Sequence, residues 1–241
     1  MDKTKFSIFI DYDNLTSVQK GSGLLDTVTK ALLQIPVEGV TPRAICDVRV
    51  YGGWYEGSEM TRLAQEITVK IQQEFPKVIR LPSNKDAGYI SVSTNAELAV
   101  ALMQEPGHHL FNTYRKKGKP SNLRVVKPSD VGCIKTECLL PKVKKILDTG
   151  RCSVEGCVTT ETPLVYRHEQ KIVDTMLTCD LIHSSGGGSD RIILISGDDD
   201  FLPPLRTIVL NGVNAFRFHT KPSSQRVPTP VGGAQLLEME L

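Results

Sequence analysis

The sequence has few aromatic residues and no long apolar run. Aromatic side chains make up 6% of its 241 residues. No apolar run approaches the ~20 residues that a membrane-spanning helix needs. The run that follows the charged Met1–Lys5 segment has five residues, which is too short for a secretory signal. We therefore expect a soluble, cytoplasmic protein with no membrane partner.

The composition also lacks the marks of a non-globular chain. With 40% apolar and 23% charged residues, it excludes a disordered chain, a collagen-like repeat and a disulfide-dense mini-protein. The length is enough for one substantial core. We expect a single domain over residues 1–219, interrupted by a basic insertion at 105–167. The Pro-, Ser- and Thr-rich tail at 220–241 is expected to be loosely packed.

A formal charge of +2 conceals a strongly basic segment. Residues 115–151 hold eleven Lys and Arg against three acids, which gives +8 there and −6 for the remainder. Such a segment indicates a polyanionic partner, although a solvated lysine-rich surface is the alternative. The expected nucleic-acid contacts are Arg115, Lys116, Lys117, Lys119, Lys142, Lys144, Lys145 and Arg151. Candidate base-stacking rings, each with core packing as its alternative, are Tyr114, Tyr166 and Trp54.

Strands and helices alternate along most of the chain. Phe6–Ile10 and Ile192–Ile195 are fully apolar, which is typical of parallel strands buried on both faces. Further strands are expected at 44–51, 77–81, 122–127 and 213–218, and helices at 24–35, 58–75, 139–147 and 168–183. A capping-box pattern at 94–97 predicts a helix over 98–103, and a last helix follows Asp200. This alternation predicts an α/β fold, with a mostly parallel central sheet flanked by helices.

Both apolar strands run directly into aspartates. Asp11 and Asp13 follow the first strand, and Asp198 and Asp200 follow the second. In open α/β sheets, ligands bind at the carboxyl ends of the strands. If the two strands are neighbours, their carboxylates share one crevice and need a cation to relieve their repulsion. Oxygen ligands of this kind suit Mg²⁺ or Mn²⁺.

The helix expected at 168–183 adds two further acids. Asp174 and Asp180 are separated by about 600° of helix rotation, so they do not share a face. Asp174, nearer the helix start, is the better candidate for the crevice. The alternative for Asp13 and Asp200 is a helix cap or a turn, and Asp199 is expected to face solvent.

Three segments resemble the motifs of NYN domains, the PIN-like nuclease group that includes the LabA-like (DUF88) proteins. Phe9–Asn14, of sequence FIDYDN, is similar to the first motif. Lys171–Asp174 with the later Asp180 is similar to the helical motif. Ile195–Pro203, ISGDDDFLP, is similar to the third motif, Ser-Gly-Asp-x-Asp-Phe. The resemblance covers roughly residues 5–104 and 168–219.

This resemblance implies a PIN-like Rossmannoid sheet and divalent-metal-dependent cleavage of RNA. The acidic positions of the family fall on Asp11, Asp174, Asp198 and Asp200, with Mg²⁺ or Mn²⁺ held by the first three. Asn14, Ser196 and Asp180 would support them. The chain departs from the family in its long insertion. The family's fourth acid has only Glu97 or Glu59 as a counterpart.

Four of the six cysteines fall in the insertion as two pairs, Cys133-x4-Cys138 and Cys152-x4-Cys157. Two close pairs can form a structural zinc site, and this spacing lies at the edge of the usual range. Some LabA-like proteins look similar at this point. Free thiols are an alternative, as is a different set completed by His108, His109 or His168. Cys46 and Cys179 lie in apolar patterns and are expected in the core.

Together these features favour a metal-dependent endoribonuclease acting on single-stranded or structured RNA, and a homo-oligomer stays open. The five histidines show no acid–base arrangement. Two alternatives remain. One is a non-catalytic RNA-binding or scaffold module of the same fold. The other, which is less favoured, is a phosphohydrolase of the haloacid-dehalogenase type with Asp11 as nucleophile.

Overall fold

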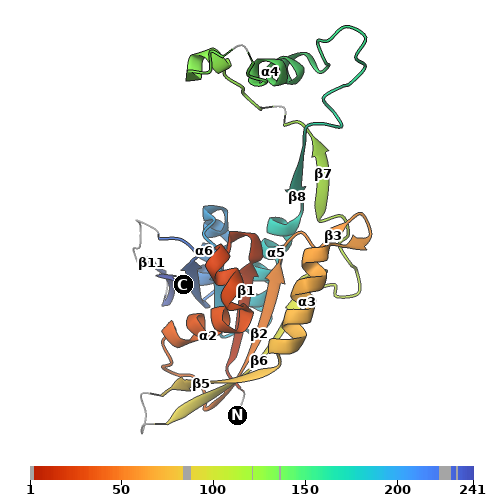
Figure 1. Ribbon diagram of the computed structural model, residues 1–241. Helices are drawn as coiled ribbons and strands as arrows, with labels where there is room; N and C mark the ends of the chain where they lie inside the picture. The colour runs from red at the N-terminus through yellow and green to blue at the C-terminus, as the bar shows by residue number, and fades with distance from the viewer. Residues whose placement is uncertain (1–2, 84–87, 121, 136, 223–228, 232) are drawn as a thin grey trace. The chain divides into compact units, whose positions relative to one another are not determined.

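The computed structural model describes residues 3–83, 88–120, 122–135, 137–222, 229–231 and 233–241. The chain divides into two compact units. Unit 1 comprises Met1–Thr113 and Gln170–Leu241, and unit 2 comprises Tyr114–Glu169 (Figure 1). The expected insertion at 105–167 therefore differs from unit 2 at both ends, because residues 105–113 belong to unit 1 and residues 168–169 belong to unit 2. No helix within the described part of the chain is long and apolar enough to span a bilayer.

The core of unit 1 is a mostly parallel sheet, as expected. Its order in the described residues is β11-β12-β10-β9-β1-β2-β6-β5. Only the outermost pairs, β5 with β6 and β11 with β12, are antiparallel. The strands are β1 (Lys5–Asp11), β2 (Arg43–Tyr51), β5 (Lys77–Pro82), β6 (Tyr89–Leu98), β9 (Arg191–Ile195), β10 (Asn214–His219), β11 (Thr229–Val231) and β12 (Ala234–Glu240).

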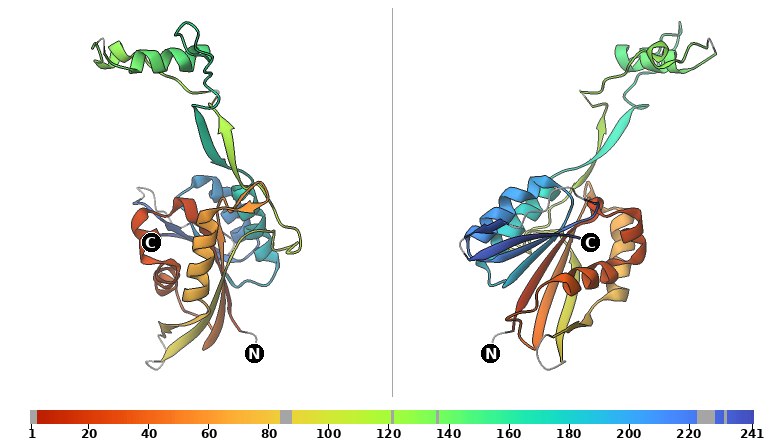
Figure 2. Two further views of the ribbon diagram at one scale, coloured as in Figure 1. Left: turned by 45° about the vertical axis from the view of Figure 1, so that its right-hand side comes forward. Right: turned by 90° about the vertical axis from the view of Figure 1, so that its left-hand side faces the viewer.

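Helices cover both faces of this sheet (Figure 2). One face packs against α1 (Ser17–Ser22), α2 (Leu24–Gln34) and α3 (Arg62–Glu74), and the other against α5 (Val173–Gly186) and α6 (Leu202–Leu210). Because side chains alternate along a strand, Ile8 and Ile10 of β1 join the core under α2 and α3. Phe9 joins the core under α5 and α6. Asp11, two residues after Phe9, therefore belongs to the face that carries α5.

The strand order reverses between β1 and β9. From β1 the chain proceeds outward to β2 and β6, whereas β9 returns to the other side of β1 and continues to β10 and β12. Ile10 pairs with Ile195 in parallel register, so Asp11 and Ser196 leave the sheet side by side. The sequence analysis required the two strands with acidic ends to be neighbours, and β1 and β9 are neighbours. In α/β sheets, ligands bind at this point, where the strand order reverses.

The helix expected from His168 begins only at Val173. Residues 166–170 form β8 (Tyr166–Gln170), which pairs with β7 (Tyr114–Gly118) in unit 2. Cross-strand pairing outweighs the helical pattern here. Between β8 and α5, Ile172 takes a left-handed backbone conformation with φ of 62°, which is unusual for a β-branched residue. This turn starts α5 just before Asp174.

Three other local expectations are wrong. Residues 94–98 continue β6 instead of capping a helix, because Thr94 Oγ1 donates to the carbonyl of Lys77 on β5 at 2.7 Å. Residues 122–127 form no strand. The helix expected from Ser58 is α3, whose cap is Thr61. The preceding residues are paired in a hairpin of β3 (Tyr55–Glu56) and β4 (Glu59–Met60).

The C-terminal tail is an integral part of the sheet, contrary to the expectation of loose packing. β12 pairs with β10 in parallel, and its Ala234 and Leu236 are buried. Their alternation gives the strand one apolar face. Residues 223–228 and 232 of the tail lie outside the described residues. The helices expected at 24–35 and after Asp200 are confirmed as α2 and α6, and the strands at 44–51, 77–81 and 213–218 as β2, β5 and β10.

Candidate metal centre

Asp11 is the buried centre of the acidic cluster. Its residue is 5% exposed, and its Oδ2 accepts hydrogen bonds from Asn14 Nδ2 at 2.6 Å and Ser196 Oγ at 2.9 Å. Burial raises the pKa of Asp11 to about 6, against the opposing effect of these two bonds, and the charge of Asp174 raises it further. The charged form of Asp11 is thus poorly solvated. A cation beside this carboxylate would favour that form.

The loop after β9 is held in place by Ser196, which is fully buried. While its hydroxyl donates to Asp11, it accepts the backbone N–H of Asp198 at 3.1 Å. Asp198 in turn caps the short 3-10 helix η3 (Asp199–Phe201), because its Oδ1 accepts the N–H of Asp200 at 3.0 Å. One oxygen of Asp198 is used in this cap. The Ser-Gly-Asp-x-Asp pattern is therefore a sequence of local bonds that fixes two carboxylates over the end of β9.

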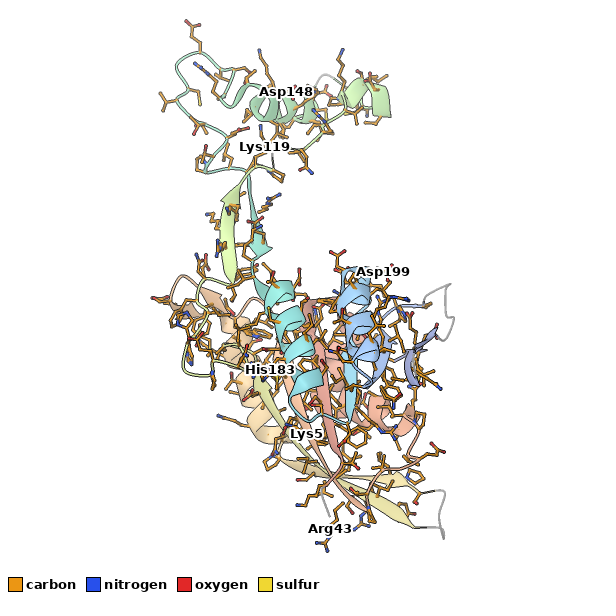
Figure 3. All side chains as sticks on the ribbon, turned by 180° about the vertical axis from the view of Figure 1, so that it is seen from behind. Lys5, Arg43, Lys119, Asp148, His183 and Asp199 are labelled. Atoms are coloured by element: carbon orange, nitrogen blue, oxygen red, sulfur yellow. The ribbon has the colours of Figure 1, made fainter. Side chains whose placement is uncertain are left out.

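Arg217 on β10 also stabilises the loop after β9. This buried guanidinium donates to the carbonyl of Ser196 at 3.3 Å and pairs with Asp199 at 2.9 Å. It also pairs with Glu238 of β12 at 3.5 Å. Asp199 is 80% exposed but bound to Arg217, so it faces solvent, as expected, and also has a structural role. In Figure 3, Asp199 lies at the opposite end of unit 1 from Lys5 and Arg43.

Asp174 brings a further carboxylate from the first turn of α5. Partial burial raises its pKa, and so do the charges of Asp198, Asp200 and Asp13. Its charge also raises the pKa of Asp11. These mutual effects place Asp174 in the electrostatic field of the acids that follow β1 and β9. Four of the sequence-derived candidates, Asp11, Asp174, Asp198 and Asp200, therefore form one coupled cluster.

Asp13 belongs to this cluster as well, although its sequence context was equally compatible with a turn. It follows Tyr12 in the 3-10 helix η1 (Tyr12–Asn14), and its carboxylate accepts a hydrogen bond from Gln170 Nε2. Burial raises its pKa, and Lys20 opposes the rise. The bond to Gln170 links the end of β1 to the chain entering α5. Asp13 is thus a fifth acid at the site.

Thr220 is a further candidate site residue that the sequence analysis missed, because no motif marks it. It follows β10, is 5% exposed, and its hydroxyl has no hydrogen-bond partner among the described residues. A Cβ placed on Gly197 would lie 3.3 Å from this hydroxyl and 3.5 Å from Asn14 Oδ1. Gly197 therefore allows the β9 loop to approach both side chains closely. A buried hydroxyl without a partner is costly unless a ligand or water satisfies it.

Asp180 does not belong to the cluster. It is 1% exposed, and it accepts hydrogen bonds from Tyr51 Oη at 2.7 Å and from the Met103 N–H at 2.8 Å. Arg49 lies 3.5 Å away and also pairs with Glu97 at 2.8 Å. The resemblance implied a supporting role for Asp180, but the structure places it in a buried network under α5. Glu97 is thus engaged elsewhere, and Glu59 is exposed in β4.

The donor set suits a hard divalent cation. Five carboxylates lie near one another, one of them has a pKa raised to about 6, and a buried hydroxyl beside them has no described partner. Carboxylates and hydroxyls are the ligand types that Mg²⁺ and Mn²⁺ prefer. Among the described residues, no three His, Cys, Asp or Glu side chains already stand in coordinating positions. The fit therefore rests on chemistry and charge, with Asp11, Asp174 and Asp198 as the residues that would hold the ion.

The two cysteine pairs of unit 2 are close within each pair. Cys133 Sγ lies 2.9 Å from Cys138 Sγ. The hydrogen bond from the Cys133 thiol lowers the pKa of Cys138, while a bond with Thr159 lowers that of Cys157. The described residues bring no three cysteines together. A zinc site of all four stays a prediction. In unit 1, Cys46 is in the core as expected, but Cys179 is exposed.

The basic side chains of unit 2 are not equivalent. Lys119 pairs with Glu161 at 2.8 Å, and Lys144 pairs with Asp148 on α4 (Leu140–Thr149) (Figure 3). Lys117 lies 3.7 Å from Glu169. The exposed members of the expected set are Lys116, Lys117, Lys142, Lys145 and Arg151, whereas Arg115, Lys119 and Lys144 are partly buried.

The candidate stacking rings also divide. Trp54 is fully buried in the core of unit 1, where its indole N–H donates to the Val50 carbonyl at 3.0 Å. It is therefore not a stacking platform. Tyr114 and Tyr166 lie on the paired strands β7 and β8 of unit 2, and Tyr166 is 48% exposed.

Comparisons with known proteins give no match. No protein-family model, no curated protein and no solved structure is significantly similar to this chain.

Proposed function

We propose that the protein is a divalent-metal-dependent endoribonuclease of the NYN type, with its centre at the carboxyl ends of β1 and β9. The observation that carries the proposal is the coupled carboxylate cluster at the reversal of strand order, around Asp11 with its pKa raised to about 6. Such a cluster favours a cation with open coordination positions for water and phosphate oxygens. The likeness of three motifs to NYN domains supports RNA as the substrate.

A bound Mg²⁺ or Mn²⁺ would supply a Lewis acid that activates water and neutralises charge on a phosphodiester. The chain supplies the rest. Asp11, Asp174 and Asp198 would hold the ion from three separate elements. Ser196 and Asn14 keep the Asp11 carboxylate oriented, and Arg217 keeps the β9 loop in register. Thr220 offers a hydroxyl to a phosphate oxygen or a water. No histidine is needed as a base.

The test is cleavage of a mixed single-stranded RNA pool by the purified chain in Mg²⁺, Mn²⁺ or EDTA. We expect cleavage with either metal, none in EDTA, and a loss of at least 100-fold in Asp198→Asn. Asp47→Asn is the matched control. Asp47 lies on the central strand β2 and pairs with Lys5 at 3.4 Å, away from the acidic end. Cleavage that persists in Asp198→Asn would refute the assignment.

The second candidate is an RNA-binding module without catalysis. It is favoured by the basic composition of unit 2, where twelve Lys and Arg face six Asp and Glu. Binding without cleavage in every metal would support it over the nuclease. The phosphohydrolase alternative requires an exposed nucleophile. The burial of Asp11 and its two accepted hydrogen bonds argue against that role.

We further propose that zinc ties the two cysteine pairs of unit 2 together. The closeness of the Cys133 and Cys138 sulfurs supports this, and so does the lowered pKa of Cys138, because zinc binds the thiolate. Elemental analysis of the purified chain should give one zinc per chain in the wild type and a loss in Cys133→Ser. Cys179→Ser is the control. A zinc-free wild type in which all four cysteines of unit 2 are free thiols would refute the proposal.

A further inference from the structure

The two paired strands of unit 2, β7 and β8, carry three neighbouring aromatic rings. Tyr114 and His168 stack across the strands, with ring centroids 4.8 Å apart and planes 16° from parallel. Tyr166 meets the edge of His168 at 5.5 Å and 80°. Tyr166 and His168 are two residues apart, so they lie on the same face of the ribbon. The three rings therefore form one continuous row.

A cation lies on this same face. The ammonium of Lys116 is 3.9 Å from the ring centroid of Tyr166, in cation–π geometry. Lys116 is two residues from Tyr114, which again places both on one face. Tyr166, His168 and Lys116 are exposed, and Tyr114 is partly buried. We name this set of four residues, Tyr114, Lys116, Tyr166 and His168, the aromatic face.

The acid of the ribbon lies on its other face. Glu169 alternates with His168 and pairs there with Arg167 at 2.9 Å and Lys117 at 3.7 Å. The aromatic face thus carries a positive charge and rings without a carboxylate from these two strands. The whole of unit 2 has twice as many Lys and Arg as Asp and Glu. This combination of charge and exposed rings matches a polyanion with flat, unpaired bases.

We propose that the aromatic face of β7 and β8 binds single-stranded RNA, by stacking bases on Tyr114, His168 and Tyr166 while Lys116 contacts a phosphate. A single strand is specified because duplex RNA hides the faces of its bases. The proposal rests on the proposed function for the choice of RNA. It adds a base-binding surface that is separate from the carboxylate cluster. The competing explanation is that the rings only stabilise the ribbon by cross-strand contact.

The test is fluorescence anisotropy of the full chain without added Mg²⁺ or Mn²⁺, where metal-dependent cleavage is suppressed and no chelator removes zinc from unit 2. Three labelled strands of equal length are compared: oligouridine, an abasic ribose-phosphate strand, and a duplex. The wild type should bind the oligouridine most tightly. Tyr166→Ala should weaken this binding by about 5- to 100-fold, while binding of the abasic strand stays unchanged. Tyr166→Phe, which keeps the ring, should restore the preference for bases.

Matched controls separate the face from general effects. Tyr89→Ala removes a tyrosine that is 65% exposed in unit 1, and it should bind like the wild type. Lys116→Ala should reduce the slope of log affinity against log salt by about 0.7, the value for one phosphate of a single strand. Circular dichroism shows whether each variant is folded. Equal affinity of the wild type for oligouridine and the abasic strand would overturn the proposal, as would a folded Tyr166→Ala that binds like Tyr89→Ala.

Failure here is distinguishable from failure of the nuclease proposal. Asp47→Asn should bind oligouridine like the wild type, since Asp47 pairs with Lys5 and belongs neither to the carboxylate cluster nor to the aromatic face. Base-dependent binding without cleavage in Mg²⁺ or Mn²⁺ would refute the nuclease proposal and support RNA binding by the aromatic face. Metal-dependent cleavage with no effect of Tyr166→Ala on binding would refute RNA binding by the aromatic face and support the nuclease proposal.

Discussion

The Ser196 hydroxyl donates a hydrogen bond of 2.9 Å to Oδ2 of Asp11, and this bond joins the loop after β9 to the end of β1. It stabilises the charged carboxylate and so lowers its pKa, against the burial that raises this pKa to about 6. The protonation state of Asp11 therefore depends on a side chain 185 residues away in sequence. The same serine orients Asp198 through its backbone N–H.

Ser196→Ala should raise the pKa of Asp11 further, because the hydrogen bond to the charged form is lost. The acid limb of the pH–rate profile for RNA cleavage should move to higher pH by about one unit. Ser189→Ala is the control. The Ser189 hydroxyl bonds at 2.7 Å to Ser7, which lies on β1 like Asp11 but away from the acidic cluster. An unmoved acid limb in Ser196→Ala would contradict the role given to this bond.

Asp11→Asn should stabilise the metal-free protein while abolishing cleavage. Both hydrogen bonds to Asp11 reach Oδ2, and an asparagine oxygen can accept both without a charge. In the folded state the pKa of Asp11 is about 6, above its ordinary value of 3.8. The protonated form of Asp11 therefore contributes its full stabilisation to the free energy of unfolding below about pH 4. This stabilisation is lost as the pH rises through about 6.

Urea unfolding in EDTA measures this effect. At pH 7 the asparagine variant should be about 1–3 kcal/mol more stable than the wild type, and the difference should vanish near pH 4. Asp47→Asn, whose side chain is 46% exposed, should differ from the wild type by less than about 0.5 kcal/mol. If the variant is less stable than the wild type at pH 7, the buried charge of Asp11 does not destabilise the folded protein.

Substitutions at Asp180 and Asp174 should have opposite effects, the first on the stability of the protein and the second on RNA cleavage. Asp180→Ala removes the acceptor of Tyr51 and Met103 and leaves Arg49 short of a partner, so the free energy of unfolding should fall by about 3 kcal/mol or more. Cleavage per folded molecule should stay within about twofold. Asp174→Asn should keep the stability but lose cleavage by at least 100-fold. Urea melts paired with rates at matched folded concentration distinguish these patterns, and the reverse pattern would place Asp180 in the site.

Thr220→Val tests the hydroxyl that has no described partner. Valine has nearly the same shape, and no described hydrogen bond of the Thr220 hydroxyl is lost. Stability should therefore be equal to or above that of the wild type. Cleavage should fall by about 5- to 30-fold if the hydroxyl binds a phosphate oxygen or a water, as one hydrogen bond is worth roughly 1–2 kcal/mol. Thr207→Val on α6, where the hydroxyl bonds to the Pro203 carbonyl, is the control. Full activity in Thr220→Val would exclude it from the site.

Much of the sheet follows from local patterns in the sequence. The apolar runs of β1 and β9 are buried on both faces, and each ends at an acid. Their adjacency could only be stated as a condition, because strand order is set by tertiary packing. The pattern at 94–97 shows the limit of local signals. Thr94 has the residue type of a helix cap, but its hydroxyl is used by the neighbouring strand β5.

The candidate site was only partly predictable for the same reason. Asp11, Asp174, Asp198 and Asp200 were marked by motifs at element ends. Asp180 lies in the same helical motif as Asp174, yet helix rotation turns it into a buried network with Tyr51. Thr220 has no motif, and its role depends on the close approach at Gly197. The tail was misjudged because the alternation of Ala234 and Leu236 is short and follows a polar segment.

The most direct measurement is the fate of water oxygen during RNA cleavage in Mg²⁺. The wild type is incubated with single-stranded RNA in ¹⁸O-labelled water, and the product ends are analysed by mass spectrometry. The account predicts one ¹⁸O in the terminal phosphate of each cleaved bond, no reaction in EDTA, and none in Asp11→Asn. Products that end in a 2′,3′-cyclic phosphate, or cleavage that continues in EDTA, would contradict it.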